Sequence, residues 1–104
     1  MVNQQSAITT VESFIMDIKK LGLKIRKVIL FGSYAKNKQQ EYSDIDVAIV
    51  SDEFTGVGFE DIKLFVKSLK NYILIQPKTY NTNYFEQGDP FIEEIIRTGI
   101  EIKV

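Results

Sequence analysis

Two aspartates separated by one residue open an apolar run, ten residues after a glycine-serine pair. The aspartates are Asp44 and Asp46, and the pair is Gly32 and Ser33. Side chains two residues apart on a strand share a face at about 6 to 7 Å, close enough to hold metal ions about 3.5 to 4 Å apart. Mg²⁺ prefers hard oxygen ligands and commonly takes one or two carboxylates together with substrate phosphates. Because a cation would offset the repulsion between the carboxylates, the pattern predicts a magnesium site.

The glycine-serine pair supplies the second half of such a site. Gly32 lets the backbone approach a ligand closely, and the amides and hydroxyl of Ser33 at a helix start form a cradle for phosphate. Each half alone is common in proteins, as a simple turn or as solvated charges at a strand end. The two together at this spacing are expected by chance in about one of a thousand chains of this size, which favours a functional site.

Composition excludes several other chemistries. The 104 residues contain no cysteine and no histidine, which excludes thiolate and imidazole metal sites, cysteine nucleophiles and histidine-based triads. The formal net charge of −1 provides no overall attraction to a nucleic-acid backbone, so any such contact has to be local. No window approaches the roughly 20 apolar residues of a membrane span, and the start lacks the pattern of a secretory leader. A cytoplasmic protein without membrane contact is therefore expected.

The apolar periodicity predicts a mixed α/β fold with a small sheet of about four strands. Residues 1–8 are polar and expected to be flexible, and residues 9–104 are expected to form a single domain. A first helix is expected to begin at Thr10 as its N-cap and to end at Gly22. A second is expected over about residues 59–70. The expected strands are "KIRKVILF", "DIDVAIV", "NYILIQP" and "IEIKV".

The end of the chain carries clear boundary signals. The third strand is expected to stop at Pro77, and residues 79–88 are expected to be a loop with a short helical turn. Asp89 as N-cap and Pro90 at the first helical position predict a last helix that runs through Arg97 and is closed by Gly99. The order of elements implies a mixed sheet covered by helices on one main face. An antiparallel pairing of the first two strands fits their short connection.

The spacing of Gly32, Ser33, Asp44 and Asp46, with an apolar strand on either side, resembles the signature of the DNA polymerase beta-like nucleotidyltransferase superfamily. The short chain and its ending, "DPFIEEIIRTGIEI", resemble the minimal members of that superfamily. These are often encoded beside a HEPN-domain partner in prokaryotes. The resemblance implies the polymerase beta-like fold and a HEPN-domain protein as partner. Apart from the resemblance, a second copy of the chain is the alternative partner.

The resemblance also implies a reaction and its ligands. An acceptor hydroxyl attacks the α-phosphate of an NTP, with ATP the expected one, so that a nucleoside monophosphate is transferred and pyrophosphate is released. Two Mg²⁺ ions would stabilise the attacking and leaving oxygens, or one ion if a ligand is missing. Asp44 and Asp46 are the implied catalytic residues and metal ligands. The implied nucleotide-binding residues are Gly32, Ser33, Lys36 and Ser43.

The chain departs from this signature at two positions. Asn37 stands where the superfamily commonly has a glycine, and asparagine tolerates left-handed backbone angles better than most residues. Active members usually add a third carboxylate from the third strand, but here Gln76 stands at or near that place. Its amide oxygen could ligate a metal weakly, but it cannot serve as a general base.

The missing carboxylate leaves three interpretations of the site. It could work with two aspartates, water and a loop acid, either Asp52 or Glu53. A partner or an oligomer could complete it. Nucleotide binding could instead have survived the loss of transfer, in which case the chain is a non-catalytic module that neutralises a HEPN-type partner. A more remote alternative is a structural domain whose aspartates have no function.

Overall fold

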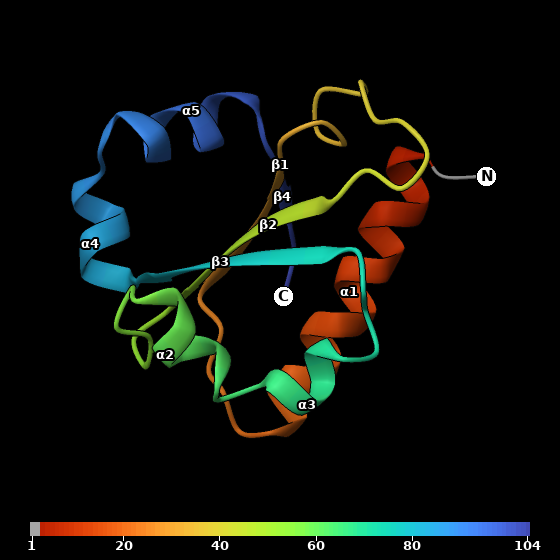
Figure 1. Cartoon of the computed structure of the whole chain (residues 1–104). Helices are drawn as coiled ribbons and strands as arrows, with labels where there is room; N and C mark the ends of the chain where they lie inside the picture. Colours follow the sequence, from red (N-terminus) through yellow and green to blue (C-terminus); the bar gives the residue numbers. More distant parts are fainter. Residues whose placement is uncertain (1–2) are drawn as a thin grey trace.

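The computed structural model describes residues 3–104 and contains a mixed four-stranded sheet with helices on both sides (Figure 1). The strands lie in the order β3-β2-β1-β4. β1 pairs antiparallel with both β2 and β4, and β2 pairs parallel with β3. The predicted α/β class, the number of strands and the antiparallel first pair are confirmed. The strands are β1 (Lys27–Phe31), β2 (Ile45–Ser51), β3 (Ile75–Asn81) and β4 (Ile100–Ile102).

The first helix begins earlier than the sequence indicated. α1 spans Gln4–Lys20, and Asn3 is its N-cap. The Asn3 side chain accepts a hydrogen bond from the Ser6 amide at 2.7 Å, and the Ser6 hydroxyl accepts one from the Asn3 amide at 3.1 Å. Because this reciprocal cap satisfies free donors at the helix start, the expected N-cap at Thr10 and the expected flexible stretch are wrong for residues 3–8. The remainder of that stretch, residues 1–2, lies outside the described residues.

One face of the sheet packs against α1 and the segment that contains α2 (Gly58–Ile62) and α3 (Val66–Leu69). The single helix expected over 59–70 is therefore wrong. Phe65 interrupts it with a non-helical φ of −141°, and its ring is buried in the core. There the ring packs edge-on against Phe14, with 5.8 Å between the centroids. Burial of this large aromatic ring offsets the loss of helical continuity.

The other face of the sheet is covered by α4 (Thr82–Gln87) and α5 (Pro90–Thr98). The expectation of helices on one main face is thus wrong, and a helix replaces most of the loop expected there. β2 is an interior strand and is buried on both faces. Its apolar side chains therefore need a layer of helices on each face of the sheet. The predicted last helix is confirmed, with Asp89 accepting a hydrogen bond from the Ile92 amide at 2.7 Å and Gly99 at the C-terminal end.

β3 continues through Pro77 to Asn81 instead of stopping at the proline. β3 lies at the edge of the sheet, and the Ile45 amide donates to the Leu74 carbonyl at 2.7 Å. By alternation, the backbone of Pro77 faces away from β2, so its missing N–H costs no ladder hydrogen bond. No helix in the described part of the chain has the length and apolar character needed to cross a bilayer.

Candidate active site

The strand register brings the two halves of the sequence motif together. Phe31, the last residue of β1, lies opposite Asp46 in β2. The turn that begins at Gly32 therefore starts beside Asp46, while Asp44 immediately precedes β2. All of these residues lie at the end of the sheet where the chain leaves β1 and enters β2 and β3 (Figure 1). The tertiary structure thus unites the glycine-serine pair and the two aspartates, as the motif predicts.

Gly32 makes a close approach to Asp46 that another residue could not make. Its φ is +77°, and a Cβ atom at this position would overlap Oδ2 of Asp46 and lie 3.2 Å from its Cγ. The following residues form a tight turn, in which the Lys36 amide donates to the Gly32 carbonyl at 3.2 Å. Asn37 adopts a φ of +57°, so the predicted left-handed conformation of this residue is confirmed.

The two aspartates have unbalanced negative charge. Asp46 is half-buried and Asp44 is exposed. Burial raises the pKa of Asp46, and the neighbouring charge of Asp44 raises it further. Within residues 3–104, neither carboxylate takes part in an ion pair. A pair of oxygen ligands with uncompensated charge fits a hard divalent cation such as Mg²⁺.

Gln76 lies beside Asp46 on the neighbouring strand. The parallel register of β2 and β3 pairs these two residues, so their side chains point to the same face of the sheet. This is the place where the sequence comparison with the superfamily put Gln76, and its role as a metal ligand stays a prediction. Among the residues that the structure describes, no three histidine, cysteine or acidic side chains gather in a way that could hold a metal ion.

The loop acids Asp52 and Glu53 lie at the far end of β2. Asp52 accepts a hydrogen bond from Arg26 at 2.7 Å, and Glu53 accepts one from the Lys24 amide at 2.8 Å. At about 3.3 Å per residue, the six residues from Asp46 to Asp52 span about 20 Å. The interpretation in which one of these acids completes the site is therefore wrong.

Lys36 and Ser43 occupy opposite ends of the connection between β1 and β2. The Ser43 hydroxyl accepts a hydrogen bond from the Gln40 amide at 2.8 Å, which closes the turn before Asp44. The Lys36 ammonium lies 3.8 Å from a carboxylate oxygen of Glu94 in α5, and both side chains are partly exposed. Contact of either residue with nucleotide stays a prediction.

Lys78 is a residue near the site that the sequence reasoning missed. It lies two residues after Gln76 in β3 and therefore shares its face of the sheet. Its ammonium lies 5.5 Å from the ring centroid of Tyr80 and 5.6 Å from that of Phe91, within the range of cation–π attraction. The alternation in "QPKTY" would have placed Gln76 and Lys78 on one face, but only if the strand continues past Pro77, where it was expected to stop.

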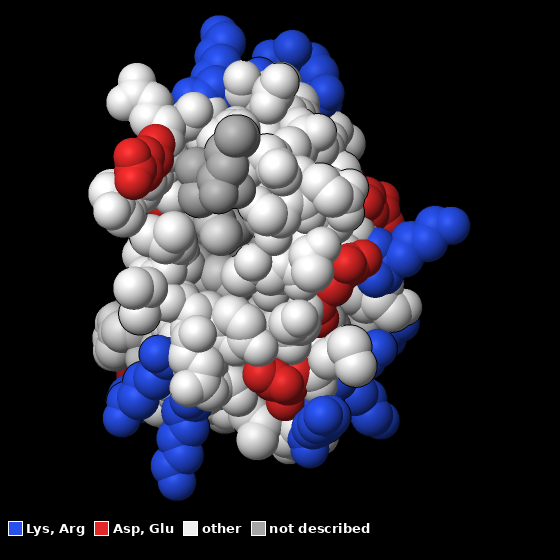
Figure 2. All heavy atoms as spheres, turned by 90° about the vertical axis from the view of Figure 1, so that its right-hand side faces the viewer, with Lys and Arg blue, Asp and Glu red and all other residues white. Residues whose placement is uncertain are grey.

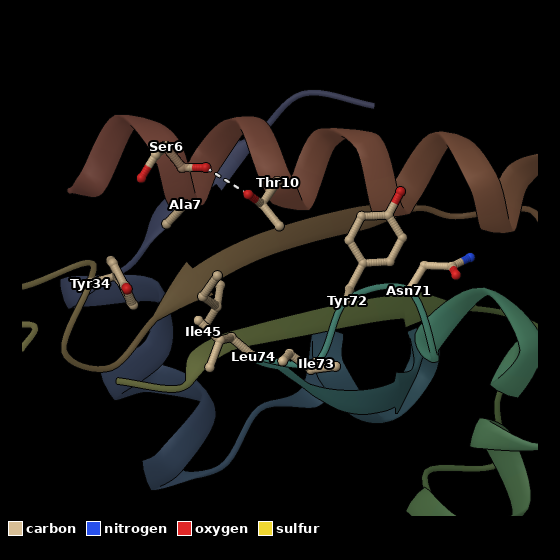
Figure 3. Close-up of a pocket in the computed structure, with 9 residues that line it drawn as sticks. All are labelled: Ser6, Ala7, Thr10, Tyr34, Ile45, Asn71, Tyr72, Ile73 and Leu74. Carbon is tan, nitrogen blue, oxygen red and sulfur yellow. Dashed lines mark hydrogen bonds between the residues drawn. The ribbon is translucent and has the colours of Figure 1, made fainter. Parts of the chain in front are cut away.

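Within residues 3–104, two hollows lie where the chain enters β3. One, of about 240 Å³, lies between α1 and residues 71–74, and is lined in part by Tyr34 and Ile45 (Figure 3). The other, of about 400 Å³, lies between α3 and the start of β3 and includes Gln76. Tyr34 follows Ser33 directly, and Ile45 stands between the two aspartates. The larger hollow thus includes Gln76 of the candidate site, while the smaller one opens on the face of the sheet opposite to the aspartates.

Comparison with known proteins places the chain in a family. A model of the family described as "Nucleotidyltransferase domain" matches residues 11–100. A protein of Methanocaldococcus jannaschii named "Putative protein adenylyltransferase" is 36% identical over 99 residues, which cover 91% of this chain and 97% of the relative. A second protein of that organism with the same description is 30% identical over 70 residues, 62% of this chain and 70% of the relative.

A solved structure agrees at the level of the fold. The crystal structure of a "putative nucleotidyltransferase" from Sulfolobus solfataricus superposes with a TM-score of 0.68 at 12% sequence identity. The match covers 94% of this chain and 80% of the other. With the family match over most of its length and the motif residues assembled at one end of the sheet, the chain belongs to the nucleotidyltransferase domain family.

Proposed function

We propose that this nucleotidyltransferase takes ATP with Mg²⁺ and transfers AMP to a hydroxyl group of a protein acceptor, with release of pyrophosphate. The observation that carries the proposal is the close approach of Gly32 to Asp46, which brings a phosphate-binding turn beside a carboxylate pair. The choice of an adenylyl group and a protein acceptor rests on the names of the M. jannaschii relatives.

The turn after Gly32 provides the phosphate contacts. Within residues 3–104, no backbone hydrogen bond uses the amides of Ser33, Tyr34 or Ala35 as donors. The segment 32–37 is a turn and not the expected helix start, and these free amides, together with the Ser33 hydroxyl, are groups with which such a turn can bind phosphate. Gly32 has no side chain to keep the phosphate away from Asp46.

The two aspartates provide the metal ligands. When bound there, Mg²⁺ neutralises phosphate charge and stabilises the attacking and leaving oxygens. Asp44 and Asp46 would hold the cation, and the phosphates would be oriented by their attraction to it. Lys78 adds a positive charge on the β3 side. Gln76 cannot accept the proton of the acceptor hydroxyl, so that proton passes to water or to a carboxylate supplied by the partner.

Nucleotide binding is tested by thermal unfolding. At an ATP concentration 100 times its Kd in Mg²⁺, binding stabilises by about 2.7 kcal/mol, and about 4 to 8 °C of Tm corresponds to each kcal/mol in a chain of this size. We expect a rise of about 10 °C or more in the wild type and in the control Glu12→Ala. The rise should disappear in Asp44→Ala combined with Asp46→Ala. A wild type that melts at the same temperature with and without ATP would refute nucleotide binding.

Transfer is tested by restoring the missing carboxylate. Labelled ATP is incubated with a co-purified partner, and incorporation into protein is followed over time. Because a positioned general base contributes about 10² to 10⁴ in rate, Gln76→Glu should raise the rate of labelling by about 100-fold or more. Gln87→Glu, an exposed glutamine of α4, is the matched control and should leave the rate unchanged. Equal rates in both variants would show that position 76 does not limit transfer.

A second candidate function is that of a nucleotide-binding module without transfer, which neutralises a HEPN-type partner. The observation that favours it is Gln76 in the register position beside Asp46. This function predicts tight binding of the partner, a thermal shift with ATP, and no labelled partner even with Gln76→Glu. Labelling of the partner by the wild type would exclude it.

A further inference from the structure

An apolar surface adjoins the candidate active site where the chain enters β3. We call it the Ile73 surface and define it by Val66, Leu69, Tyr72, Ile73 and Leu74. Ile73 lines both hollows and is 86% exposed, which is the highest value among the exposed large apolar residues of the described chain. Figure 3 shows it next to Tyr72 and Leu74 at the rim of the smaller hollow. A contiguous exposed apolar patch marks a site of interaction.

The Ile73 surface meets the candidate site at Gln76. The smaller hollow reaches Ile45, whose side chain lies in the α1 layer, on the face of the sheet opposite to Asp44 and Asp46. The larger hollow reaches Gln76, which lies beside Asp46. A polypeptide that lies across Ile73 can therefore bring one of its side chains to the position where a third carboxylate is missing.

The margin of the Ile73 surface is basic. Lys67 and Lys70 of the α3 segment are exposed, and within residues 3–104 neither takes part in an ion pair. No acidic residue occurs between positions 62 and 85. One acid of α1, Asp17, accepts a hydrogen bond from the Tyr72 hydroxyl at 2.6 Å, so the margin combines two lysines with one acidic side chain. Figure 2 shows the side that carries α1 and the entry to β3, with a mainly uncharged centre and both basic and acidic side chains around its edge.

These features distinguish among classes of partner. In a symmetric dimer centred on Ile73, the same patch meets itself, so the interface would hold two copies of Lys67 and Lys70 and gain no acidic counterpart for them. Single-stranded nucleic acid binds through exposed aromatic rings and a basic groove, whereas this surface is mainly aliphatic and has two unpaired lysines at its margin. Aliphatic contacts with a basic margin are complementary to a polypeptide that combines aliphatic and acidic side chains.

We propose that the Ile73 surface docks a segment of the protein acceptor that has aliphatic anchor residues with Asp or Glu close to them. The segment places its acceptor hydroxyl near Gln76. The identification of the docked segment as the acceptor rests on the proposed transfer. The docking itself requires neither ATP nor Mg²⁺.

The test is a selection from a randomised library of 12-residue peptides displayed on phage. The full chain is the bait, and Ile73→Glu is used for counter-selection. We expect the enriched peptides to combine Leu, Ile, Val or Phe with Asp and Glu. Enrichment of basic or purely polar peptides, or no enrichment over the counter-selection, would overturn the proposal.

The affinity of one enriched peptide, labelled with fluorescein, is then measured by anisotropy. Ile73→Glu, and Lys67→Glu combined with Lys70→Glu, should each weaken binding by 10-fold or more. The matched controls are Ile96→Glu, a 55% exposed isoleucine of α5, and Lys19→Glu combined with Lys20→Glu, which should bind as the wild type does. Melting curves confirm that each variant is folded. Equal affinity of the Ile73→Glu variant and the wild type would overturn the assignment.

Two further measurements separate the outcomes. Asp44→Ala combined with Asp46→Ala should lose the ATP-dependent thermal shift but still bind the peptide, because docking does not need the nucleotide. If the wild type shows the thermal shift but binds no peptide, the docking proposal is overturned and nucleotide binding stands. Sedimentation of the wild type and of Ile73→Glu tests the second copy as occupant. A wild-type dimer that becomes a monomer in Ile73→Glu would overturn the proposal, as would tighter binding of a 20-nucleotide RNA than of any peptide.

Discussion

Gly32 and Gly22 have the same left-handed backbone conformation but different surroundings. Their φ values are +77° and +96°. A Cβ atom at Gly32 would collide with Asp46, whereas one at Gly22 would have no heavy atom within 4 Å. The backbone angle alone therefore explains glycine at position 22, while position 32 needs glycine also because of its contact with the candidate site.

The comparison of Gly32→Ala with Gly22→Ala separates these two causes. Both variants should lose about 1 kcal/mol of unfolding free energy from the left-handed backbone, measured by denaturant titration. Only Gly32→Ala should also displace Asp46 and abolish the rise in Tm that ATP and Mg²⁺ produce. An unchanged nucleotide-dependent rise in Gly32→Ala would show that this close approach is not needed for binding.

Asp61 connects three elements near the edge of the sheet. This carboxylate of α2 is 2% exposed. It accepts hydrogen bonds from the amide and hydroxyl of Thr55 at 2.8 and 3.0 Å, from the Gly56 amide at 2.9 Å and from the Thr79 hydroxyl in β3 at 2.7 Å. Burial raises the pKa of Asp61, but these hydrogen bonds outweigh it and lower the pKa below its ordinary value. The network thus joins the loop after β2, the helix and the edge strand.

Asp61→Ala should be strongly destabilising, since it leaves buried donors without an acceptor. We expect a loss of about 2 to 4 kcal/mol in denaturant titration at neutral pH, whereas Glu60→Ala, an exposed neighbour in α2, should change stability by less than about 0.5 kcal/mol. Because the folded pKa of Asp61 is lowered, its contribution is present above the unfolded value of about 3.9 and is lost as the pH falls through the folded pKa. A difference between wild type and Asp61→Ala that does not shrink at low pH would contradict this account.

The molecule has two apolar layers that share one sheet. Ile18 of α1 belongs to the layer on one face, and Ile92 of α5 belongs to the layer on the other, and both are fully buried. The central strand β2 contributes side chains to both layers. Loss of packing on either face therefore weakens the same sheet.

Ile18→Ala and Ile92→Ala should each destabilise the whole chain, because a small domain with a shared sheet unfolds in one transition. The expected loss is about 2 to 5 kcal/mol for each. Ile96→Ala, the exposed isoleucine of α5, is the control and should lose less than about 0.5 kcal/mol. Far-ultraviolet circular dichroism and tyrosine fluorescence should give coincident curves for all three variants; separate transitions for the two layers would contradict the shared sheet.

Local patterns in the sequence were sufficient to predict the proximity of the motif residues, the α/β class and the last helix. The Asp89, Pro90 and Gly99 boundaries were predicted correctly, because capping and proline act through neighbouring backbone groups. The proximity of Gly32 and Asp46 was also predictable, since a short connection between two strands favours an antiparallel pair.

Tertiary packing decided the features that depend on distant residues. The burial of Phe65 against Phe14 divided the expected second helix, and the position of β3 at the sheet edge allowed the strand to continue through Pro77. The position of the loop acids 20 Å or so from the aspartates follows from the length of β2, about 3.3 Å per residue. The second helical layer and the exposure of Ile73 likewise depend on which surfaces meet in the folded chain. Local periodicity carries no information on such meetings, because burial is a property of neighbours in space.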